Sequence, residues 1–442
     1  MSHPLIATLT FLLFQLTTAT LFLRPAEMFD WLADVPLYEG LILSTLVLSA
    51  FSLEPHFHVR AMYRQPITFC VIGVFVAIIL SQLTHAYLGG VRDSATEFSK
   101  TLLYYGLVIT AVNSPTRMRW FLANLGICCG LMVTLCLLDY WKVVDLEFIV
   151  HLQDLDGFDD EGEPIWFERM RGTGIFQDPN DLAMVIVAAG CLCLYFLTDK
   201  TLGIWRGLWA LPIGVFAIAI LETKSRGGLL AGAAAVMAMA SLRYGTKVAV
   251  VFAVLGGCML PIVAGRSGNI EFSEGSTSEE RLLMWREGFD AIKSPEILFG
   301  IGHGTYADLA GLVAHNSFVH TYVELGLFGG TLFLGCFFVA AVQIYRIGQQ
   351  PQEVFHTELL RMRPYVAGVM AGWCMSMVSL SRCYVVPTFM VLGMQAAYLN
   401  LVWIHTYSGK PLLIWDRWEC FRLTTVSACV FTGLYVFTMV MT

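Results

Sequence analysis

Residues 315–345 read HNSFVHTYVELGLFGGTLFLGCFFVAAVQIY, and this stretch decides the fold class. After the His315–Asn316 pair it continues as one apolar segment. That segment is longer than the about 20 residues with which a helix crosses the hydrocarbon core of a membrane. His315 stands at its beginning, so the sequence predicts a titratable ring at the water edge of a membrane helix.

Glycines follow this histidine at a defined spacing. After the His315–Asn316 pair come nine residues and then Gly326 and Gly329. In a helix continuous from His315, steps of about 100° bring Tyr322, Gly326 and Gly329 to within about 40° of the histidine. The sequence therefore predicts a stripe of small residues running into the bilayer, a groove suited to chemistry on a lipid-borne substrate.

The composition of the whole chain also indicates a membrane protein. Of the 442 residues, 57% are hydrophobic and 14% are charged, and the mean hydropathy is +0.66, values that exclude a soluble globular protein. We expect an all-α, polytopic membrane helix bundle with about 12–13 transmembrane helices, forming a single integral membrane domain over residues 1–442. The predicted spans are 4–23, 37–53, 66–85, 97–113, 118–138, 180–198, 207–221, 227–242, 247–264, 316–345, 365–381, 384–404 and 423–441.

The charges between the spans predict the orientation. Short segments such as 54–65, 346–364 and 405–422 carry Lys and Arg at high density, so we place them in the cytoplasm together with the N-terminus. Two long, acid-rich loops, 139–179 and 265–315, are expected on the outer, periplasmic side. Because the first span lacks a basic leader region and a cleavage site, we expect a retained helix and not a signal peptide.

The first polar cluster is RGTGIFQDPND at residues 171–181. Asp178, Pro179 and Asn180 predict a turn and a helix start, because proline fixes φ and Asx side chains cap exposed N–H groups. Capping alone explains these three residues, and a binding role is the alternative. Arg171 has no capping function, so it is a candidate binding residue.

The second cluster, ETKSRGGLL at residues 222–230, places Lys224 and Arg226 at the beginning of a span. A cation at a helix N-terminus opposes the helix dipole by about 0.3–1 kcal/mol, so helix preference does not explain this placement. The free N–H groups of the first turn, two glycines and the Arg226 guanidinium together suit phosphate oxygens. The alternative is that Arg226 extends to lipid headgroups.

The third cluster lies in the second outer loop. Residues 278–293, SEERLLMWREGFDAIK, predict an amphipathic helix on the membrane surface, with Arg281 and Trp285 four positions apart. The run GIGHG, which contains His303, follows no strand of a βαβ unit, so it predicts a tight turn near the reacting groups and not a nucleotide-binding loop.

The remaining polar groups have structural explanations. His320 and Glu324 are one helical turn apart, and their pairing neutralises a carboxylate that otherwise costs about 2.5–3.5 kcal/mol in a membrane. The acidic run 154–163 fails the EF-hand spacing, so we expect a solvated loop and no metal. The twelve cysteines show no CxxC or Cys/His ligand spacing, so neither a zinc site nor a disulfide scaffold is supported.

These segments together resemble the O-antigen ligase and Wzy-type polymerase family. The resemblance covers about residues 100–405, with its motifs confined to 171–330. It is carried by RGTGIFQDPND, by Arg-x-x-x-Leu from Arg226, by the succession of Arg281, Trp285 and GIGHG, and above all by HNSFVHTYVELGLFGG. The family pattern of His, then Asn, Ser or Arg, nine residues and Gly-x-x-Gly is met by His315, Asn316, Gly326 and Gly329.

The resemblance implies a metal-independent, inverting glycosyltransferase without a cofactor, at the outer face of the bacterial inner membrane. Its donor is a glycan on undecaprenyl diphosphate, and its acceptor is lipid A core, another glycan or a protein. Membrane lipids are expected partners and nucleic acid is not. Carried over to this chain, the resemblance implies that His315 takes the proton of the acceptor hydroxyl. It also implies that Arg226 and Arg281 hold the diphosphate. Arg171 matches a basic family position, and Asn316, Gly326, Gly329 and Asn180 are expected to support the site.

The chemistry of these residue types agrees with that activity. A glycosyl diphosphate already has a good leaving group, so the site needs fixed positive charge beside the phosphates and a base for the alcohol. Arginines supply the charge. A histidine with an unperturbed pKa of about 6.5 is mostly neutral at periplasmic pH, as a base must be.

Two kinds of alternative stay open. A glycan polymerase and a protein O-oligosaccharyltransferase share these motifs with a ligase, and the sequence does not separate them. A transporter or flippase of lipid-linked oligosaccharides belongs to another class. Transporters commonly have two related halves with broken helices near the midplane, whereas here we find no repeat, and the polar residues gather at one face.

Overall fold

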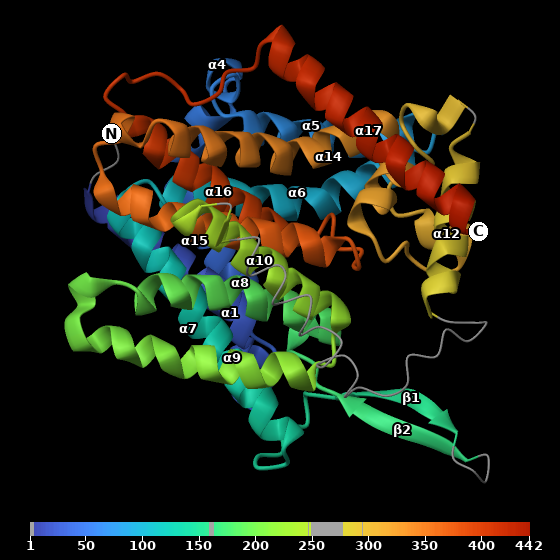
Figure 1. The fold of residues 1–442 in the computed structure, drawn as a ribbon, viewed down its shortest axis with the longest axis horizontal. Coiled ribbons are helices and arrows are strands. Elements are labelled where there is room, and N and C mark those ends of the chain that lie inside the picture. Colours follow the sequence, from blue (N-terminus) through green and yellow to red (C-terminus); the bar gives the residue numbers. More distant parts are fainter. Residues whose placement is uncertain (1–3, 159–162, 246, 249–276, 294) are drawn as a thin grey trace. The chain divides into compact units, whose positions relative to one another are not determined.

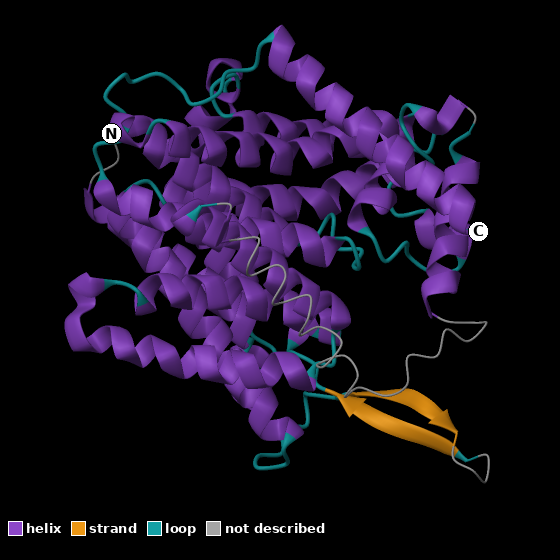
Figure 2. Cartoon of the chain, viewed as in Figure 1, coloured by secondary structure: helices purple, strands orange, loops and turns teal. Residues whose placement is uncertain are grey.

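The computed structural model describes residues 4–158, 163–245, 247–248, 277–293 and 295–442. Within these residues, ten helices are long and apolar enough to cross a membrane. Helices dominate the described chain, and the strands drawn in it form one hairpin (Figure 2). The predicted class is confirmed: the protein is a polytopic, mostly helical membrane protein.

Two predicted spans correspond to helices outside those ten. The span 97–113 overlaps α6 (Leu88–Ala111), and the span 365–381 overlaps α15 (Thr357–Met377). Both are helical as expected, and their crossing of the membrane stays a prediction. The span 247–264 lies, from residue 249 onward, outside the described residues.

The chain folds into two compact units. Unit 1 comprises residues 1–49, 114–270 and 361–376, and unit 2 comprises residues 50–113, 271–360 and 377–442. The described elements of unit 1 are α1 (Pro4–Leu23), α2 (Pro25–Met28), η1 (Asp30–Leu32), most of α3 (Leu37–Leu53), α7 (Pro115–Tyr140), β1 (Leu152–Phe158), β2 (Pro164–Arg169), η3 (Gly174–Phe176), α8 (Pro179–Leu197), η4 (Lys200–Trp209), α9 (Ala210–Glu222), α10 (Arg226–Tyr244) and most of α15.

Unit 2 holds the long apolar segment that follows His315. Its described elements are η2 (Glu54–Phe57), α4 (Val59–Met62), α5 (Pro66–Leu83), α6, α12 (Thr277–Ala291), η5 (Pro295–Ile297), α13 (Tyr306–Ala310), α14 (Ser317–Gln349), η6 (Pro351–Glu353), α16 (Val386–Ile404) and α17 (Arg417–Met441). Helices α5 and α14 run side by side, and α17 crosses α14 (Figure 1).

An antiparallel β-hairpin, β1–β2, occupies the first long loop, where the sequence analysis expected only a solvated acidic loop. Leu152 pairs with Arg169, and an irregularity falls between Leu155 and Gly157. Strand β2 reads PIWFER, which is rich in residues that favour strands. The hairpin is tied to the turn before α10, because the Met170 N–H donates to the Glu222 carbonyl at 3.1 Å. Of the acidic run 154–163, residues 159–162 lie outside the described residues.

Small residues set the approach of α5 to α14. A Cβ added to Gly73 would lie 2.9 Å from a Leu332 methyl, and one added to Gly329 would lie 2.9 Å from the Ala77 methyl. Small residues that let two helix backbones approach are the usual basis of helix pairing in membranes. Gly329 therefore serves the packing of α14 against α5.

Helix α14 is broken at Gly326, whose φ is 65° and ψ is −168°. The loop before the helix replaces the helical hydrogen bonds that the break removes. The Ile301 N–H donates to the Val323 carbonyl at 3.0 Å, and the Gly302 N–H donates to the Glu324 carbonyl at 3.1 Å. Beyond the break, the Phe328 N–H donates to the Leu298 carbonyl at 3.0 Å. The expectation of a helix continuous from His315 is wrong, because a loop hydrogen-bonds to the opened backbone.

Two glycines make this junction possible. A Cβ on Gly326 would lie 2.4 Å from the carbonyl atoms of Leu298, and a Cβ on Gly300, at φ 77°, would lie 2.3 Å from the carbonyl atoms of Glu324. The dihedral angles of Gly326 also fall in a region that only glycine adopts freely. The loop and the helix therefore approach each other backbone to backbone.

Gly326→Ala should lower the midpoint of thermal unfolding of the detergent-purified protein. The backbone conformation alone costs alanine about 1–3 kcal/mol, and the added methyl group meets the Leu298 carbonyl. Gly190→Ala in α8 is the control, because its methyl group meets no atom within 4 Å. Equal midpoints for Gly326→Ala and the wild type would contradict this account of the break.

Candidate active site

His315 lies just before α14 and not on it. Its φ is 49°, the left-handed region, and its side chain is half-buried. Because the helix begins at Ser317 and breaks at Gly326, the predicted stripe that joins His315 to Tyr322, Gly326 and Gly329 along one helical face does not form. Gly326 and Gly329 are buried, so the predicted glycine-lined groove below the histidine is also wrong.

Contacts on both sides hold His315 in this conformation. The Asn316 side chain caps α14 by accepting hydrogen bonds from the N–H groups of Phe318 at 3.0 Å and Val319 at 3.1 Å. The Trp285 indole donates to the Ala314 carbonyl at 2.6 Å. A left-handed residue that is not glycine persists only where its surroundings fix it, and here a helix cap and an indole do so.

Arg281 belongs to the same part of unit 2 as His315. It lies on α12 four residues before Trp285, about 6 Å along the same helix face, and its side chain is half-buried. Trp285 on the same helix bonds to the residue preceding His315, so α12 is fastened to that segment. The predicted helix at 278–293 is confirmed by α12, and it lies in unit 2 together with His315.

The loop between α15 and α16 adds an arginine that the sequence analysis did not select. The Ser317 hydroxyl accepts a hydrogen bond from the Arg382 N–H at 2.8 Å and donates to the Leu380 carbonyl. These bonds fix the backbone of Arg382 beside Ser317, which begins α14 and follows His315 by two residues. A signal was present, because Arg382 lies between the predicted spans 365–381 and 384–404, at the end expected to face the outer side.

The GIGHG run forms the predicted tight turn. Gly300, Gly302 and Gly304 all have positive φ. The His303 ring is 7% exposed and its Nδ1 lies 3.1 Å from the Ser94 hydroxyl. Burial lowers the pKa of His303 below its usual value, against the opposing effect of Glu324. A neutral, buried His303 is a structural support of the turn.

His320 and Glu324 form the predicted pair inside α14, with His320 Nε2 3.0 Å from a Glu324 carboxylate oxygen. The same oxygen accepts the Tyr306 N–H at 3.1 Å. Together with the bond from Gly302 to the Glu324 carbonyl, this fastens the glycine turn and α13 onto the broken helix. The pair therefore also holds a loop against the broken helix.

In unit 1, Arg226 is the first residue of α10, as predicted. Ser225 caps the helix by accepting the Gly228 N–H at 3.0 Å. The Arg226 side chain is exposed and makes no ion pair or side-chain hydrogen bond with the residues that the structure describes. A solvent-accessible guanidinium beside the positive end of a helix dipole is available to an anion.

Asn180 links the beginnings of α8 and α10. Asp178 caps α8 by accepting the Asn180 N–H at 2.7 Å, as predicted. The Asn180 side-chain oxygen accepts the Ser225 hydroxyl at 2.6 Å and an Arg169 N–H at 3.4 Å. Asn180 therefore has a structural role beyond capping, since it sets the spacing of two helix N-termini.

Arg169 is a second arginine that the sequence analysis did not select. Its guanidinium donates to the Thr223 carbonyl at 3.0 Å and to the Asp154 carboxylate at 2.9 Å. It thus joins the hairpin to the turn that precedes Arg226. The available signal was the strand-favouring sequence PIWFER, which ends at Arg169. A strand there would have placed Arg169 in a paired hairpin and not in a loop.

Arg171 lies next to a different group of residues. Its N–H donates to the ring of His151 at 3.3 Å, and its guanidinium donates to the Val150 carbonyl at 3.5 Å. His151 in turn lies 3.0 Å from the Asp139 carboxylate. These contacts give Arg171 a part in fixing the segment before β1, and its binding of a ligand stays a prediction.

The predicted site draws on both units. Arg171, Asn180 and Arg226 belong to unit 1, and Arg281 and His315 belong to unit 2. The meeting of Arg226 with Arg281 and His315 therefore stays a prediction.

Comparison with known families identifies the region that carries most of these residues. Residues 211–334 match the family model described as O-Antigen ligase. This region is an O-antigen ligase family domain. The protein is thus a multi-pass membrane protein in which residues 211–334 match the O-antigen ligase family. No curated protein matches the chain.

The O-antigen ligase domain includes Arg226, Arg281, His315, Gly326 and Gly329 within its limits. The predicted family is confirmed over this range, which is narrower than the about 100–405 that the sequence suggested. The cluster at 171–181 lies outside the matched residues.

Trp285→Phe should reduce glycan transfer by about 2–10-fold, because the ring stays but the hydrogen bond that holds Ala314 is lost. We expect the fall in kcat, with the KM for the lipid-linked donor unchanged. The matched control is Trp418→Phe, which alters a tryptophan that is 62% exposed on α17. An unchanged kcat for Trp285→Phe would remove Trp285 from the positioning of His315.

Proposed function

We propose that the protein is a metal-independent, inverting glycosyltransferase that moves a glycan from undecaprenyl diphosphate to an acceptor hydroxyl. The reaction would take place at the outer face of the bacterial inner membrane. The main support is His315, a half-buried histidine in a left-handed conformation that lies inside an O-antigen ligase domain. Its backbone is fixed from both sides by Trp285 and the Asn316 cap.

His315 would act as the general base. The acceptor oxygen attacks the anomeric carbon, its proton passes to the neutral imidazole, and the bond from that carbon to the diphosphate oxygen breaks with inversion. A base positioned beside the acceptor contributes about 10²–10⁴-fold to such a step. Holding the imidazole in one orientation matters because a base acts only within hydrogen-bond reach of the proton.

Arginines would stabilise the leaving diphosphate, which gains negative charge as the bond breaks. Fixed positive charge at that point lowers the barrier directly. Arg226 is supported by its exposure at the start of α10, and Arg281 by its position one turn from Trp285. Arg171 is a weaker candidate, because its guanidinium already bonds to the Val150 carbonyl.

Three enzymes of this class use the same donor and differ in their acceptor. They are a ligase that uses lipid A core, a glycan polymerase and a protein O-oligosaccharyltransferase. An assay with purified protein and radiolabelled undecaprenyl-diphosphate glycan separates them when each acceptor is supplied in turn. Transfer without added nucleotide or metal is the expected result.

A flippase of lipid-linked oligosaccharides is the candidate from another class, and the broken helix α14 is the feature that favours it. In transporters the opened backbone serves the substrate or its coupling ion. Here the carbonyls of Val323 and Glu324 accept hydrogen bonds from the loop residues Ile301 and Gly302. The break is therefore occupied by the protein itself, which supports the enzyme over the carrier. Donor binding without turnover would favour the carrier.

His315→Ala should abolish transfer while leaving donor binding and expression near the wild-type level. The variant loses the base but no phosphate contact. The control is His58→Ala, since His58 is an exposed histidine whose carboxylate partner lies at 3.7 Å. Retained transfer in His315→Ala, or loss of donor binding, would contradict the role of base.

Arg226→Lys should reduce transfer nearly as much as Arg226→Ala, because lysine keeps the charge but cannot form the paired N–H contacts of a guanidinium. The same comparison applies at Arg281. Arg206→Lys is the control, since Arg206 is exposed on η4. Full activity of Arg226→Lys would mean that charge alone suffices or that the residue lies outside the site.

A further inference from the structure

Tyr306, the first residue of α13, bonds to two other helices at once. Its N–H donates to the Glu324 carboxylate of α14 at 3.1 Å, and its hydroxyl donates to the Met284 carbonyl of α12 at 2.8 Å. The side chain is 0% exposed. A buried tyrosine hydroxyl needs a hydrogen-bond partner, and here that partner belongs to a helix other than the one that binds the main chain. Tyr306 therefore ties α12 to α14.

Helix α12 is also bonded to the segment that leads into His315. Trp285, which is on the same helix, donates to the Ala314 carbonyl. The contacts thus run from Glu324 through Tyr306 to α12, from α12 to Ala314, and from there along the chain back to the start of α14. They close a ring, and His315 is the residue of that ring between Ala314 and the cap of α14.

The ring is packed as well as hydrogen-bonded. A Cβ added to Gly288 of α12 would lie 2.8 Å from the Tyr306 hydroxyl and 2.9 Å from a Val323 methyl, so this glycine lets α12 approach both residues. One buried apolar cluster contains Tyr306 together with Ala314, the residue before His315. The members of the cluster are Phe289, Ile292, Tyr306, Ala314, Val319 and Val323. A displacement of Tyr306 would therefore be passed to the backbone beside His315.

Glu324 is the end of the ring inside a membrane-spanning helix. Its side chain is 1% exposed, and a carboxylate in such a place is costly. The 3.0 Å contact with His320 offsets this cost. It does not explain why the helix carries a carboxylate, because an apolar residue would avoid the cost altogether. The bond to the Tyr306 N–H gives the carboxylate a task that no apolar side chain performs.

We propose that Glu324 and Tyr306 are positioning residues for the candidate base His315, an inference that rests on the proposed function. Both act through α12 and Ala314, and not on the substrate, by holding the His315 backbone at its φ of 49°. Such a conformation persists only where the surroundings fix it. A misplacement of about 1 Å can lower the rate of an enzyme about 100-fold. The ring would therefore affect the rate of transfer more than the binding of either substrate.

Tyr306→Phe tests the bond to α12, because it removes the hydroxyl and keeps the buried ring. We expect kcat for glycan transfer to fall by about 3–10-fold, the effect of one lost hydrogen bond, with the KM values for donor and acceptor unchanged. The matched control is Tyr322→Phe. Tyr322 is also 0% exposed, and its hydroxyl lies 2.8 Å from the Ser427 hydroxyl, outside the ring. An unchanged kcat in Tyr306→Phe, or an equal fall in both variants, overturns the proposal.

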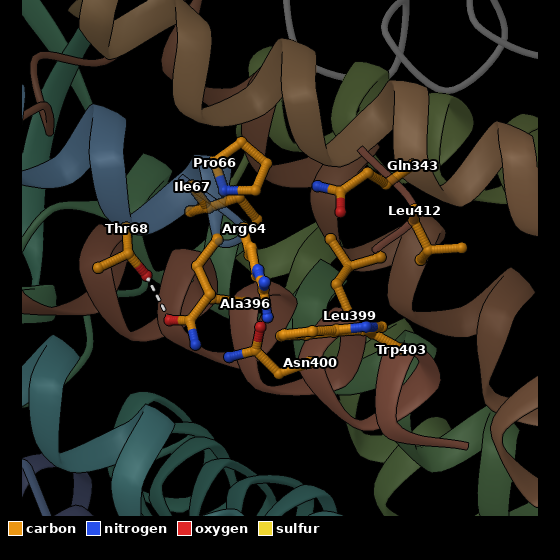
Figure 3. A pocket seen from close by; sticks show the side chains of 11 residues that line it. Arg64, Pro66, Ile67, Thr68, Gln343, Ala396, Leu399, Asn400, Trp403 and Leu412 are labelled. Carbon is orange, nitrogen blue, oxygen red and sulfur yellow. Dashed lines mark hydrogen bonds between the residues drawn. The ribbon is translucent and has the colours of Figure 1, made fainter. Parts of the chain in front are cut away.

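Two variants of Glu324 test the bond to α14. Glu324→Gln keeps an acceptor oxygen for the Tyr306 N–H, whereas Glu324→Leu removes it. We expect the Gln variant to keep kcat within about 3-fold of the wild type and the Leu variant to lose about 10-fold or more, both at unchanged KM. The control is Gln343→Leu, which changes a buried polar residue of the same helix at the small pocket near its other end (Figure 3). Equal kcat in the two Glu324 variants removes Glu324 from the proposal.

Hydrogen exchange of the purified full-length protein tests the positioning without any assay of transfer. Peptides that cover residues 306–315 should exchange about 5-fold faster in Tyr306→Phe than in the wild type, because a bond that closes the ring is lost. In Tyr322→Phe they should exchange as in the wild type. Faster exchange in a protein whose wild type transfers no glycan supports the fixing of His315 by Tyr306 and rejects the proposed function. Unchanged exchange in Tyr306→Phe overturns the positioning, whether or not glycan is transferred.

Discussion

The backbone junction between the opened helix α14 and the loop at residues 298–302 is the constraint on which the rest of unit 2 depends. In a membrane, every backbone N–H and carbonyl needs a partner inside the protein. Opening a helix at Gly326 frees carbonyls at Val323 and Glu324, and the loop supplies N–H groups to both. This is possible because neither backbone carries a Cβ at the crossing. The junction brings the glycine turn against the helix whose cap follows His315.

The candidate site residues are divided between the two units. Unit 2 carries the candidate base together with Arg281 and Arg382, and the segment around the start of α14 is bonded to Trp285 of the Arg281 helix and to the Arg382 N–H. Unit 1 carries Arg226 at a helix start whose spacing from α8 is set by Asn180.

The sequence predicted much of the fold and part of the site. Hydropathy located the helices because burial in lipid requires long apolar runs, and helix caps such as Asp178 followed from local chemistry. The break at Gly326 was not predicted, because helical periodicity assumes a continuous helix. The loop that hydrogen-bonds to the opened backbone precedes the helix in the sequence, so the periodicity of the helix itself does not reveal it. Polar segments inside α6 hid its first turns. Arg169 and Arg382 were not selected because their roles arise from tertiary contacts, which a single sequence does not display.

The β-hairpin in unit 1 has a mechanical consequence. Two bonds, from Met170 to the Glu222 carbonyl and from Arg169 to the Thr223 carbonyl, join it to the turn from which α10 starts. A ligand or antibody that displaced the strands would act through these two bonds on the turn before Arg226, so the position of that arginine depends on the hairpin.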